Sequence, residues 1–237
     1  ASDRADYILK ESSPEEDIRA AYITNVVLTA DESSLLPGID IVGFIKDYYT
    51  PGCNSVLPVI SLDADDKPVL SGGAVMKKDV MVGELDYEQS NIYVMLRENS
   101  STGIMVYECE LRGEKCEVTA LCGITRSIKT NRRGSGYEFE IALDINADIM
   151  EISSLTSMTP SVEEINILTE QLNKSVEERA YKYLNYIHKE LGLDNLGLAR
   201  EVLARDRAQA EQCDTKEFWQ DIKVTVKADS FLEAVTP

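Results

Sequence analysis

The sequence predicts an α+β protein of two successive domains, the C-terminal one an antiparallel sheet covered by a long helix and a shorter helix. Segments with alternating apolar residues come first in that domain, a helical stripe of about thirty residues follows, and a short strand comes last. The order β-β-β-α-α-β returns the last strand to the same sheet. Because the pattern changes near residues 86–100 and residues 97–102 are polar, we place the domains at residues 1–92 and 93–237.

The first domain has the signals of a small mixed α/β fold. Ser13 and Pro14 open a short helix that runs to about Ala20, because Ser caps the helix, Pro suits the first turn and Glu16 completes the capping pattern. Residues 22–28 are rich in β-branched side chains and follow as a strand.

The rest of the first domain predicts one helix and three strands. Apolar residues recur at helical spacing over residues 39–49, and Pro51-Gly52 ends that helix. Residues 56–62 form a strand whose Pro58 favours an edge position, since proline cannot donate to a neighbouring strand. Two apolar runs around a short polar turn predict a β-hairpin over residues 68–85.

The second domain begins with three predicted strands, at residues 102–111, 117–128 and 137–145. Alternation is clearest in the third strand, where charged residues separate apolar ones at Tyr137, Phe139, Ile141, Leu143 and Ile145. Such alternation puts one face on a core and the other in water, which is typical of an antiparallel sheet.

A long helix is predicted from Thr159-Pro160 to Gly192. Its apolar residues form one stripe: Ile165, Leu168, Leu172, Val176, Ala180, Tyr183, Leu184, Ile187 and Leu191. About 30 residues span roughly 45 Å, enough to cover the sheet, a use that we favour over a coiled-coil seam between two proteins. Asp194 caps the shorter helix, and Trp219 anchors the core before a last strand at 222–226.

Charge excludes several classes of partner. The 237 residues include 42 Asp and Glu against 24 Lys and Arg, a formal net charge of −18. Such a surface repels nucleic-acid phosphates and anionic lipid headgroups, so we expect no nucleic-acid partner. The sequence has no apolar run of the roughly 18–20 residues that cross a bilayer and no signal-peptide core at its start, so we expect a soluble chain.

The residues that most enzymes and metal sites need are sparse. His188 is the single histidine, and its Tyr- and Lys-rich surroundings favour an exposed or boundary helix position over a catalytic base. The glycine-containing segments 71–73 and 132–136 match no phosphate-binding loop. We therefore assign no catalytic, metal-ligating, cofactor-binding or ligand-binding residue, expect no cofactor, and predict that the protein is not an enzyme.

The five cysteines contain no CxxC pair and are too few for a disulfide scaffold: Cys53, Cys109, Cys116, Cys122 and Cys213. Two of them, Cys109 and Cys116, flank the turn-like residues 111–115 and would face each other across a hairpin. We favour free thiols packed as small apolar side chains over a bridge, since unpaired Cys is among the most buried residue types.

Residues 71–96 resemble a segment of the Ger(x)C spore-germination lipoproteins. In that family a strand of the type G-x-A-V-F-K leads through a turn to K-L-V-G-x-L, an acidic stretch and a second apolar run. The matching residues here are Gly73, Ala74, Val75, Lys77, Val82, Gly83, Leu85 and Glu88. Met76 stands where the family usually has Phe.

Further segments are similar to the family and follow its order. Residues 124–152 match a strand–turn–strand that ends in Glu, residues 191–205 keep a rhythm of aspartate followed by leucine and glycine, and a Trp precedes the last strand. The residues that carry these matches are Glu151, Asp194, Leu196, Gly197 and Trp219. Residues upstream of 71 follow the family's middle domain, so the resemblance covers nearly the whole chain.

The resemblance implies the C subunit of a nutrient germinant receptor (GerAC-like). Members are lipid-anchored on the outer face of the spore inner membrane, and their partners are two membrane-embedded subunits of the same receptor. The family's lipoprotein signal, modified Cys and N-terminal domain are not in this sequence, so we expect an N-terminally truncated chain that reaches the membrane only through that anchor. The expected function is that of a non-catalytic soluble part that acts in nutrient-triggered germination through protein contacts.

One alternative of a different class stays open. The chain would then be an extracytoplasmic module that binds a small molecule, or a carboxylate-dependent hydrolase, and a cleft lined by facing carboxylates would favour it. Among the matching residues, Gly73 and Gly83 are expected to serve backbone geometry or close packing and Trp219 the core. Glu151 is either a solvated edge carboxylate or a polar anchor between domains.

Overall fold

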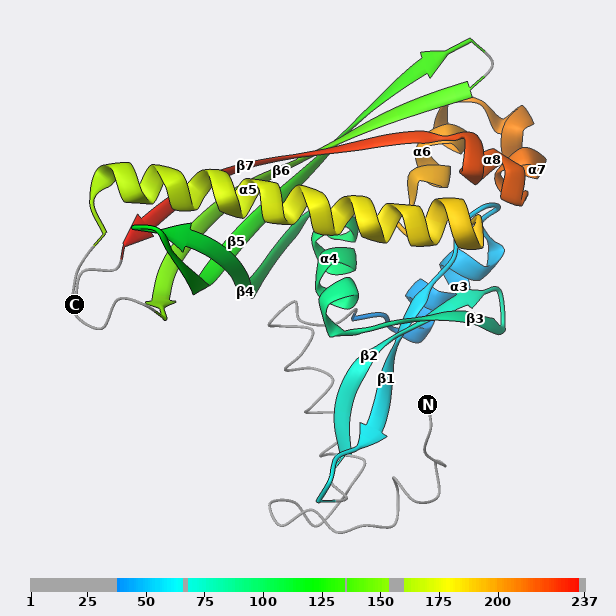
Figure 1. Cartoon of the computed structure of the whole chain (residues 1–237). Helices are drawn as coiled ribbons and strands as arrows, with labels where there is room; N and C mark the ends of the chain where they lie inside the picture. Colours follow the sequence, from blue (N-terminus) through cyan, green and yellow to red (C-terminus); the bar gives the residue numbers. More distant parts are fainter. Residues whose placement is uncertain (1–37, 66–67, 135, 154–159, 235–237) are drawn as a thin grey trace. The chain divides into compact units, whose positions relative to one another are not determined.

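The computed structural model describes residues 38–65, 68–134, 136–153 and 160–234, which Figure 1 shows in colour. The helix expected up to Ala20 and the strand expected at 22–28 lie outside the described residues. The chain divides into two compact units that both contain helices and strands, so the predicted α+β class is confirmed.

The two units are not simply successive in the sequence. Unit 1 comprises the described residues up to Val94 together with Leu193–Thr215, and unit 2 comprises Met95–Gly192 together with the described residues from Lys216 onward. Sequence order placed Leu193–Thr215 in the second domain, because nothing in its local pattern indicates a return to the first. The two units are compact groups of residues and do not test the domain limits, so 1–92 and 93–237 stay a prediction.

Unit 1 contains helix α3 (Ile41–Tyr49) and a three-stranded sheet of order β1-β2-β3. The strands are β1 (Val56–Leu62), β2 (Pro68–Lys77) and β3 (Val80–Leu85), all antiparallel, which confirms the predicted strand and hairpin. β1 lies at an edge of this sheet, the position that Pro58 favours.

Side-chain capping explains where the helices of this region begin. The Asp40 side chain accepts a hydrogen bond from the Gly43 N–H at 2.6 Å and so caps α3. Helix α4 (Tyr87–Arg97) was not predicted, although Asp86 and Gln89 form a reciprocal capping box. The Asp86 N–H donates to Gln89 Oε1 at 3.0 Å, and the Gln89 N–H donates to Asp86 Oδ1 at 2.8 Å.

The returning segment of unit 1 is helical. It contains α6 (Leu198–Arg205), a 3-10 turn (Arg207–Gln209) and α7 (Ala210–Cys213). The shorter helix that the sequence predicts after Asp194 is present as α6, but it belongs to unit 1 and not, as predicted, to the unit that holds the C-terminal sheet.

Unit 2 is built on a four-stranded sheet of order β4-β5-β6-β7. The strands are β4 (Ser100–Leu111), β5 (Glu114–Arg133), β6 (Gly136–Ile152) and β7 (Lys223–Ala234). The first three pair antiparallel, as predicted, but β7 pairs parallel with β6 and corrects the prediction at this edge. The reason is the connection: the chain crosses the sheet through a helix between β6 and β7, and such a crossover returns a strand in the same direction.

Helix α5 (Val162–Leu184) lies along one face of this sheet (Figure 1). Ser161 and Glu164 form a capping box at its start, and π-helical turns (Asn185–Leu191) continue it. The Glu164 carboxylate also accepts from Arg112 at 2.6 Å, and this bond, together with that from Ser161, lowers the pKa of Glu164 to about 2. The predicted stripe is the buried face of the helix: Leu168, Leu172, Val176, Ala180, Tyr183, Leu184 and Ile187.

His188 corrects the sequence prediction, because its side chain is only 2% exposed. Its ring lies against that of Trp219 in helix α8 (Lys216–Asp221), with centroids 5.6 Å apart. Position 188 follows Leu184 by four residues and so belongs to the apolar stripe, whereas the prediction gave more weight to polar neighbours. Burial, and then Lys189, lowers the pKa of His188 to about 3, so the ring is neutral at pH 7. Trp219 is 1% exposed and is the core anchor that was predicted.

Candidate functional site

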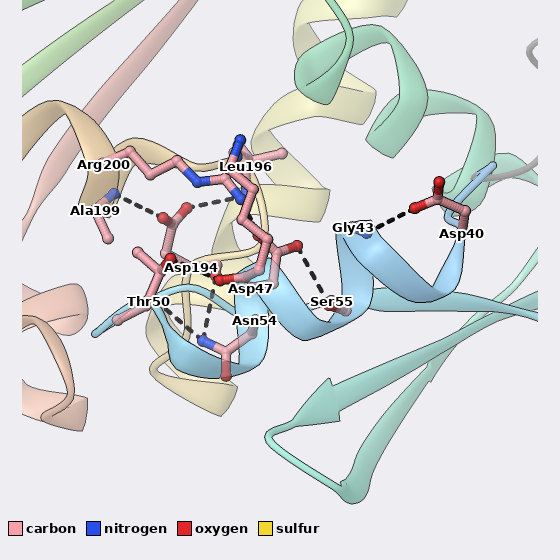
Figure 2. Close-up of polar contacts among 12 residues, drawn as sticks. Asp40, Gly43, Asp47, Thr50, Asn54, Ser55, Asp194, Leu196, Ala199 and Arg200 are labelled. Atoms are coloured by element: carbon pink, nitrogen blue, oxygen red, sulfur yellow. Dashed lines mark hydrogen bonds and ion pairs between the residues drawn. The ribbon is translucent and has the colours of Figure 1, made fainter.

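A buried polar cluster of unit 1 forms where the segment Leu193–Thr215 meets the loop between α3 and β1 (Figure 2). Cys53 and Asp194 form an isolated parallel bridge there. The Asp194 carbonyl oxygen accepts from the Asn54 backbone N–H at 2.8 Å and from the Asn54 side-chain amide at 3.2 Å. Since Asn54 and Asp194 are both buried, these bonds satisfy polar groups that water does not reach.

The Asp194 carboxylate prepares the start of α6. Oδ1 accepts from the Leu196 N–H at 2.9 Å, and Oδ2 accepts from the Ala199 N–H at 2.8 Å. Gly197 between them has a φ of 81°, a left-handed conformation that glycine adopts without steric cost. The sequence pattern of Asp194, Leu196 and Gly197 thus specifies a helix start, and the predicted capping by Asp194 is confirmed.

A second carboxylate, that of Asp47 in α3, is also buried. One of its oxygens is paired with the Arg200 guanidinium of α6, and the other accepts from the Ser55 hydroxyl at 3.2 Å. Asp47 is 1% exposed and Arg200 is partly exposed, so the pair joins a buried anion to a cation that still reaches water. A buried carboxylate requires such a partner, because an unpaired charge in the interior is strongly unfavourable.

Gly52, in the loop before β1, contacts the end of the returning segment Leu193–Thr215. Its N–H donates to Asp214 Oδ1 at 2.7 Å, and its φ is 75°. A Cβ at this position would lie 2.6 Å from the Cys213 Cβ and 2.7 Å from the Cys213 carbonyl oxygen. The chain passes so close to α7 that only glycine fits.

These contacts define what the cluster does chemically. The carboxylate oxygens of Asp194 accept backbone N–H groups, and those of Asp47 face a guanidinium and a hydroxyl, so the acids hold a chain segment in place. In the described part of the chain, no group of three or more His, Cys, Asp and Glu side chains is placed to hold a metal ion. None of the described helices combines the length and apolarity that a bilayer crossing needs.

Residues 71–235, well over half of the chain, match the family model described as spore germination B3/GerAC like, C-terminal. The chain belongs to this family. Its fold is similar to that in the crystal structure of the GerBC protein, with a TM-score of 0.69 and 13% sequence identity over 98% of this chain. The chain spans 66% of the GerBC chain. No curated protein matches the sequence.

The GerAC-like match includes one half of the cluster and leaves the other half upstream. Asp194 and the α6 start lie within the matched residues, whereas Asp47, Gly52 and Asn54 precede them. The family is described by spore germination and not by a catalytic activity.

The structure places the residues that the sequence singled out at separate points of the GerAC-like fold. Gly73 packs tightly in β2, where a Cβ would lie 2.7 Å from Val56 Cγ1, which supports the close-packing interpretation. Gly83 pairs with Val75 in the β2–β3 hairpin. Glu151 is exposed near the end of β6, opposite Thr119, so it has the environment of a solvated carboxylate.

Sequence reasoning missed Asp47, Asn54 and Arg200. Asp47 stood on the polar side of a predicted amphipathic helix, and its partner Arg200 lies 153 residues away. No local signal joins two residues at that separation. Asp214 was missed for the same reason, since its bond to the Gly52 N–H spans 162 residues.

Proposed function

We propose that this chain is the non-catalytic, extracytoplasmic part of a germinant-receptor C subunit that takes part in nutrient-triggered spore germination through protein contacts. Membership of the GerAC-like family supports the role in germination. The similarity to GerBC supports a shared fold over nearly the whole chain.

The observation that carries the non-catalytic part of the proposal is how the buried carboxylates of unit 1 are used. One Asp194 oxygen accepts the Leu196 N–H just before α6, the other accepts the Ala199 N–H in its first turn, and Asp47 is paired with Arg200. A general acid or base needs an oxygen that can reach a substrate proton. These acids are instead occupied by the protein's own groups.

Location and partners follow from the family. An N-terminal lipid anchor of the family's kind would hold the protein on the outer face of the spore inner membrane beside the membrane-embedded subunits of the same receptor. With such an anchor the described units need no apolar or basic surface for the membrane. This agrees with a formal net charge of −18, which disfavours contact with anionic headgroups.

A subunit of this kind acts by contacts that differ between two receptor states. A nutrient bound elsewhere shifts the receptor between these states, and a subunit with equal contacts in both would change nothing. The required property is therefore a surface complementary to one state of its neighbours.

The test is deletion of the parent gene in the organism that carries it. We expect spores that no longer respond to the nutrients sensed by this receptor but still germinate with agents that bypass nutrient receptors. Reintroduction of the intact gene should restore the nutrient response. Spores that lack the gene and respond to every nutrient as the parent strain does would refute the proposed role.

A further inference from the structure

The four-stranded sheet of unit 2 has one covered and one uncovered face. Helix α5 covers the face that carries Tyr107, Phe139 and Leu143, all nearly fully buried. The opposite face carries large apolar side chains that are 39–61% exposed: Ile104, Val106, Leu121, Met150 and Phe231. Isolated exposed apolar residues are ordinary, but a group of them on one sheet face is typical of a contact surface.

Strand register places Ile104, Val106, Leu121 and Phe231 on the same face of the sheet. Ile104 lies directly opposite Leu121, and Val106 follows Ile104 by two residues on the same face. Phe231 lies opposite Asn146, which lies opposite Gly123, two residues from Leu121. Ile104, Val106 and Leu121 thus form a continuous apolar strip, and Phe231 lies two strands from it, about 10 Å across the sheet at about 4.8 Å per strand, on the far side of Asn146. We call the exposed apolar side chains of this face, with the polar residues between them, the open-face patch.

Like charges face each other around the open-face patch. Glu108 lies opposite Glu117, Asp144 opposite Asp229, and Asp148 opposite Glu233. All six carboxylates are exposed, and none of them forms an ion pair with another described residue. Like charges directly opposite on neighbouring strands destabilise a sheet, so the arrangement leaves a repulsion that a cationic partner would relieve.

The other end of the same sheet face is electrostatically balanced. Lys223 pairs with Glu138, and Lys227 lies 3.7 Å from Glu140. Arg133 lies 3.7 Å from Glu138 as well. The unbalanced negative charge of this face is therefore concentrated at the end where the apolar side chains are exposed.

The edges of the sheet are less accessible than this face. On β4, the Gln171 side chain of α5 bonds both the N–H and the carbonyl of Glu110, at 2.9 and 3.2 Å, and Arg179 donates to the Val106 carbonyl at 2.7 Å. On β7, the Ala228 N–H donates to Glu177 at 3.0 Å. A strand that added to either edge would have to displace these bonds, so a partner gains more from the uncovered face.

We propose that the open-face patch docks a protein segment with apolar side chains flanked by Lys and Arg, such as one basic amphipathic helix of another receptor subunit. The apolar side chains would cover Ile104, Leu121 and Phe231, and the basic groups would meet the facing carboxylates. An anionic membrane surface is the wrong occupant, since the acidic groups would repel its headgroups. The inference rests on the proposed function and adds the surface and the chemistry of the partner.

The first experiment places a photo-cross-linking amino acid, p-benzoylphenylalanine, at Leu121 of the full-length protein in spores. The control site is Tyr181, which is 73% exposed on α5 and lies outside the patch. We expect Leu121 to cross-link to a receptor-subunit peptide that contains apolar residues flanked by Lys or Arg, as identified by mass spectrometry, at about tenfold higher yield than Tyr181. Equal yields at the two sites, no adduct at Leu121, an adduct to lipid, or a peptide without Lys and Arg would overturn the proposal.

The second experiment separates this proposal from the proposed function. In a strain that lacks the gene, the double variant Ile104→Ser/Leu121→Ser should reduce the nutrient response about tenfold, and Tyr181→Ser should restore it fully. The melting temperature of the purified double variant should stay within about 2 °C of the parent, since both side chains are exposed. If deletion abolishes the response but the double variant restores it fully, the open-face patch is not the docking surface and the proposed function stands. If deletion has no effect, the proposed function itself fails.

Discussion

The carboxylate of Asp194 accepts the backbone N–H of Ala199 at 2.8 Å inside the first turn of α6. The same residue is 0% exposed, and its carbonyl oxygen receives the Asn54 N–H from the loop before β1. One side chain thus begins a helix while the backbone of the same residue joins that helix to the first part of the chain. Unit 1 depends on this residue for the position of its returning segment.

Replacement of Asp194 by alanine should destabilise unit 1 strongly. The buried N–H groups of Leu196 and Ala199 would both lose their acceptor, and an unsatisfied buried donor costs about 1–3 kcal/mol. We expect Asp194→Ala to lower the free energy of unfolding by about 2–5 kcal/mol in urea titrations. Asp206→Ala is the matched control, because Asp206 caps an exposed turn at Ala208 and should cost about 1 kcal/mol or less. Equal losses for the two variants would contradict the assignment.

Gly52→Ala tests the close approach of the chain to α7. The new Cβ would lie 2.6 Å from the Cys213 Cβ in a backbone conformation with φ of 75°, so strain and overpacking add and the expected loss is about 2–4 kcal/mol. Gly113→Ala has a similar φ of 80° with open space around it, and should cost only about 1–2 kcal/mol. Urea unfolding of both variants gives the comparison. A Gly52 variant no less stable than the Gly113 variant would show that the contact with Cys213 is not tight.

The buried histidine should make the stability of unit 2 depend on pH. The pKa of His188 is lowered to about 3 by burial, below its ordinary value of 6.5, so the unfolded chain binds a proton that the folded chain refuses. Above pH 6.5 the ring is neutral in both the folded and the unfolded chain. As the pH drops from 6.5 toward 3, the free energy of unfolding falls by about 1.4 kcal/mol per pH unit. Between pH 7.5 and 5.0 the parent protein should lose about 2 kcal/mol more than His188→Phe, which keeps a ring against Trp219. Identical pH dependence in urea titrations of the two proteins would refute this.

Cys109 and Cys116 should be the cysteine pair that oxidises first. Their sulfur atoms lie 2.7 Å apart on directly opposite residues of β4 and β5, and the Cα separation of such pairs falls in the range of disulfides. Burial, and then the bond to Cys116, raises the pKa of Cys109 to about 12, so the exchange should be slow at pH 7. Oxidised glutathione, which takes up the two electrons and two protons, should produce a Cys109–Cys116 bond in peptide mapping while Cys122 stays a thiol. A mixed disulfide at Cys122 before any Cys109–Cys116 bond would contradict the prediction.

The sequence predicted the elements whose signals are local. The alternation from Tyr137 to Ile145 and the stripe of α5 gave the sheet and its covering helix, because period two and period 3.6 follow directly from backbone geometry. The facing of Cys109 and Cys116 followed from a tight turn between them and is confirmed by the strand register. All five cysteines are buried thiols, as the favoured interpretation had it.

What the sequence did not predict depends on contacts between distant residues. The pair of Asp47 and Arg200 and the assignment of Leu193–Thr215 to unit 1 leave no trace in any short window. The parallel pairing of β7 was missed because strand direction depends on the path of the chain through α5. Burial of His188 was misjudged because neighbours of mixed polarity concealed its place on the apolar stripe.

The central claim is that this chain acts by protein contact and does not itself bind the nutrient. The most direct measurement is the melting temperature of the purified protein in the presence of amino acids and sugars. A ligand at one hundred times its dissociation constant stabilises a folded protein by about 2.7 kcal/mol, which corresponds to a rise of roughly 5–10 °C for a chain of this size. We expect no rise with any of these compounds. A reproducible rise that saturates with the concentration of one of them would contradict the account.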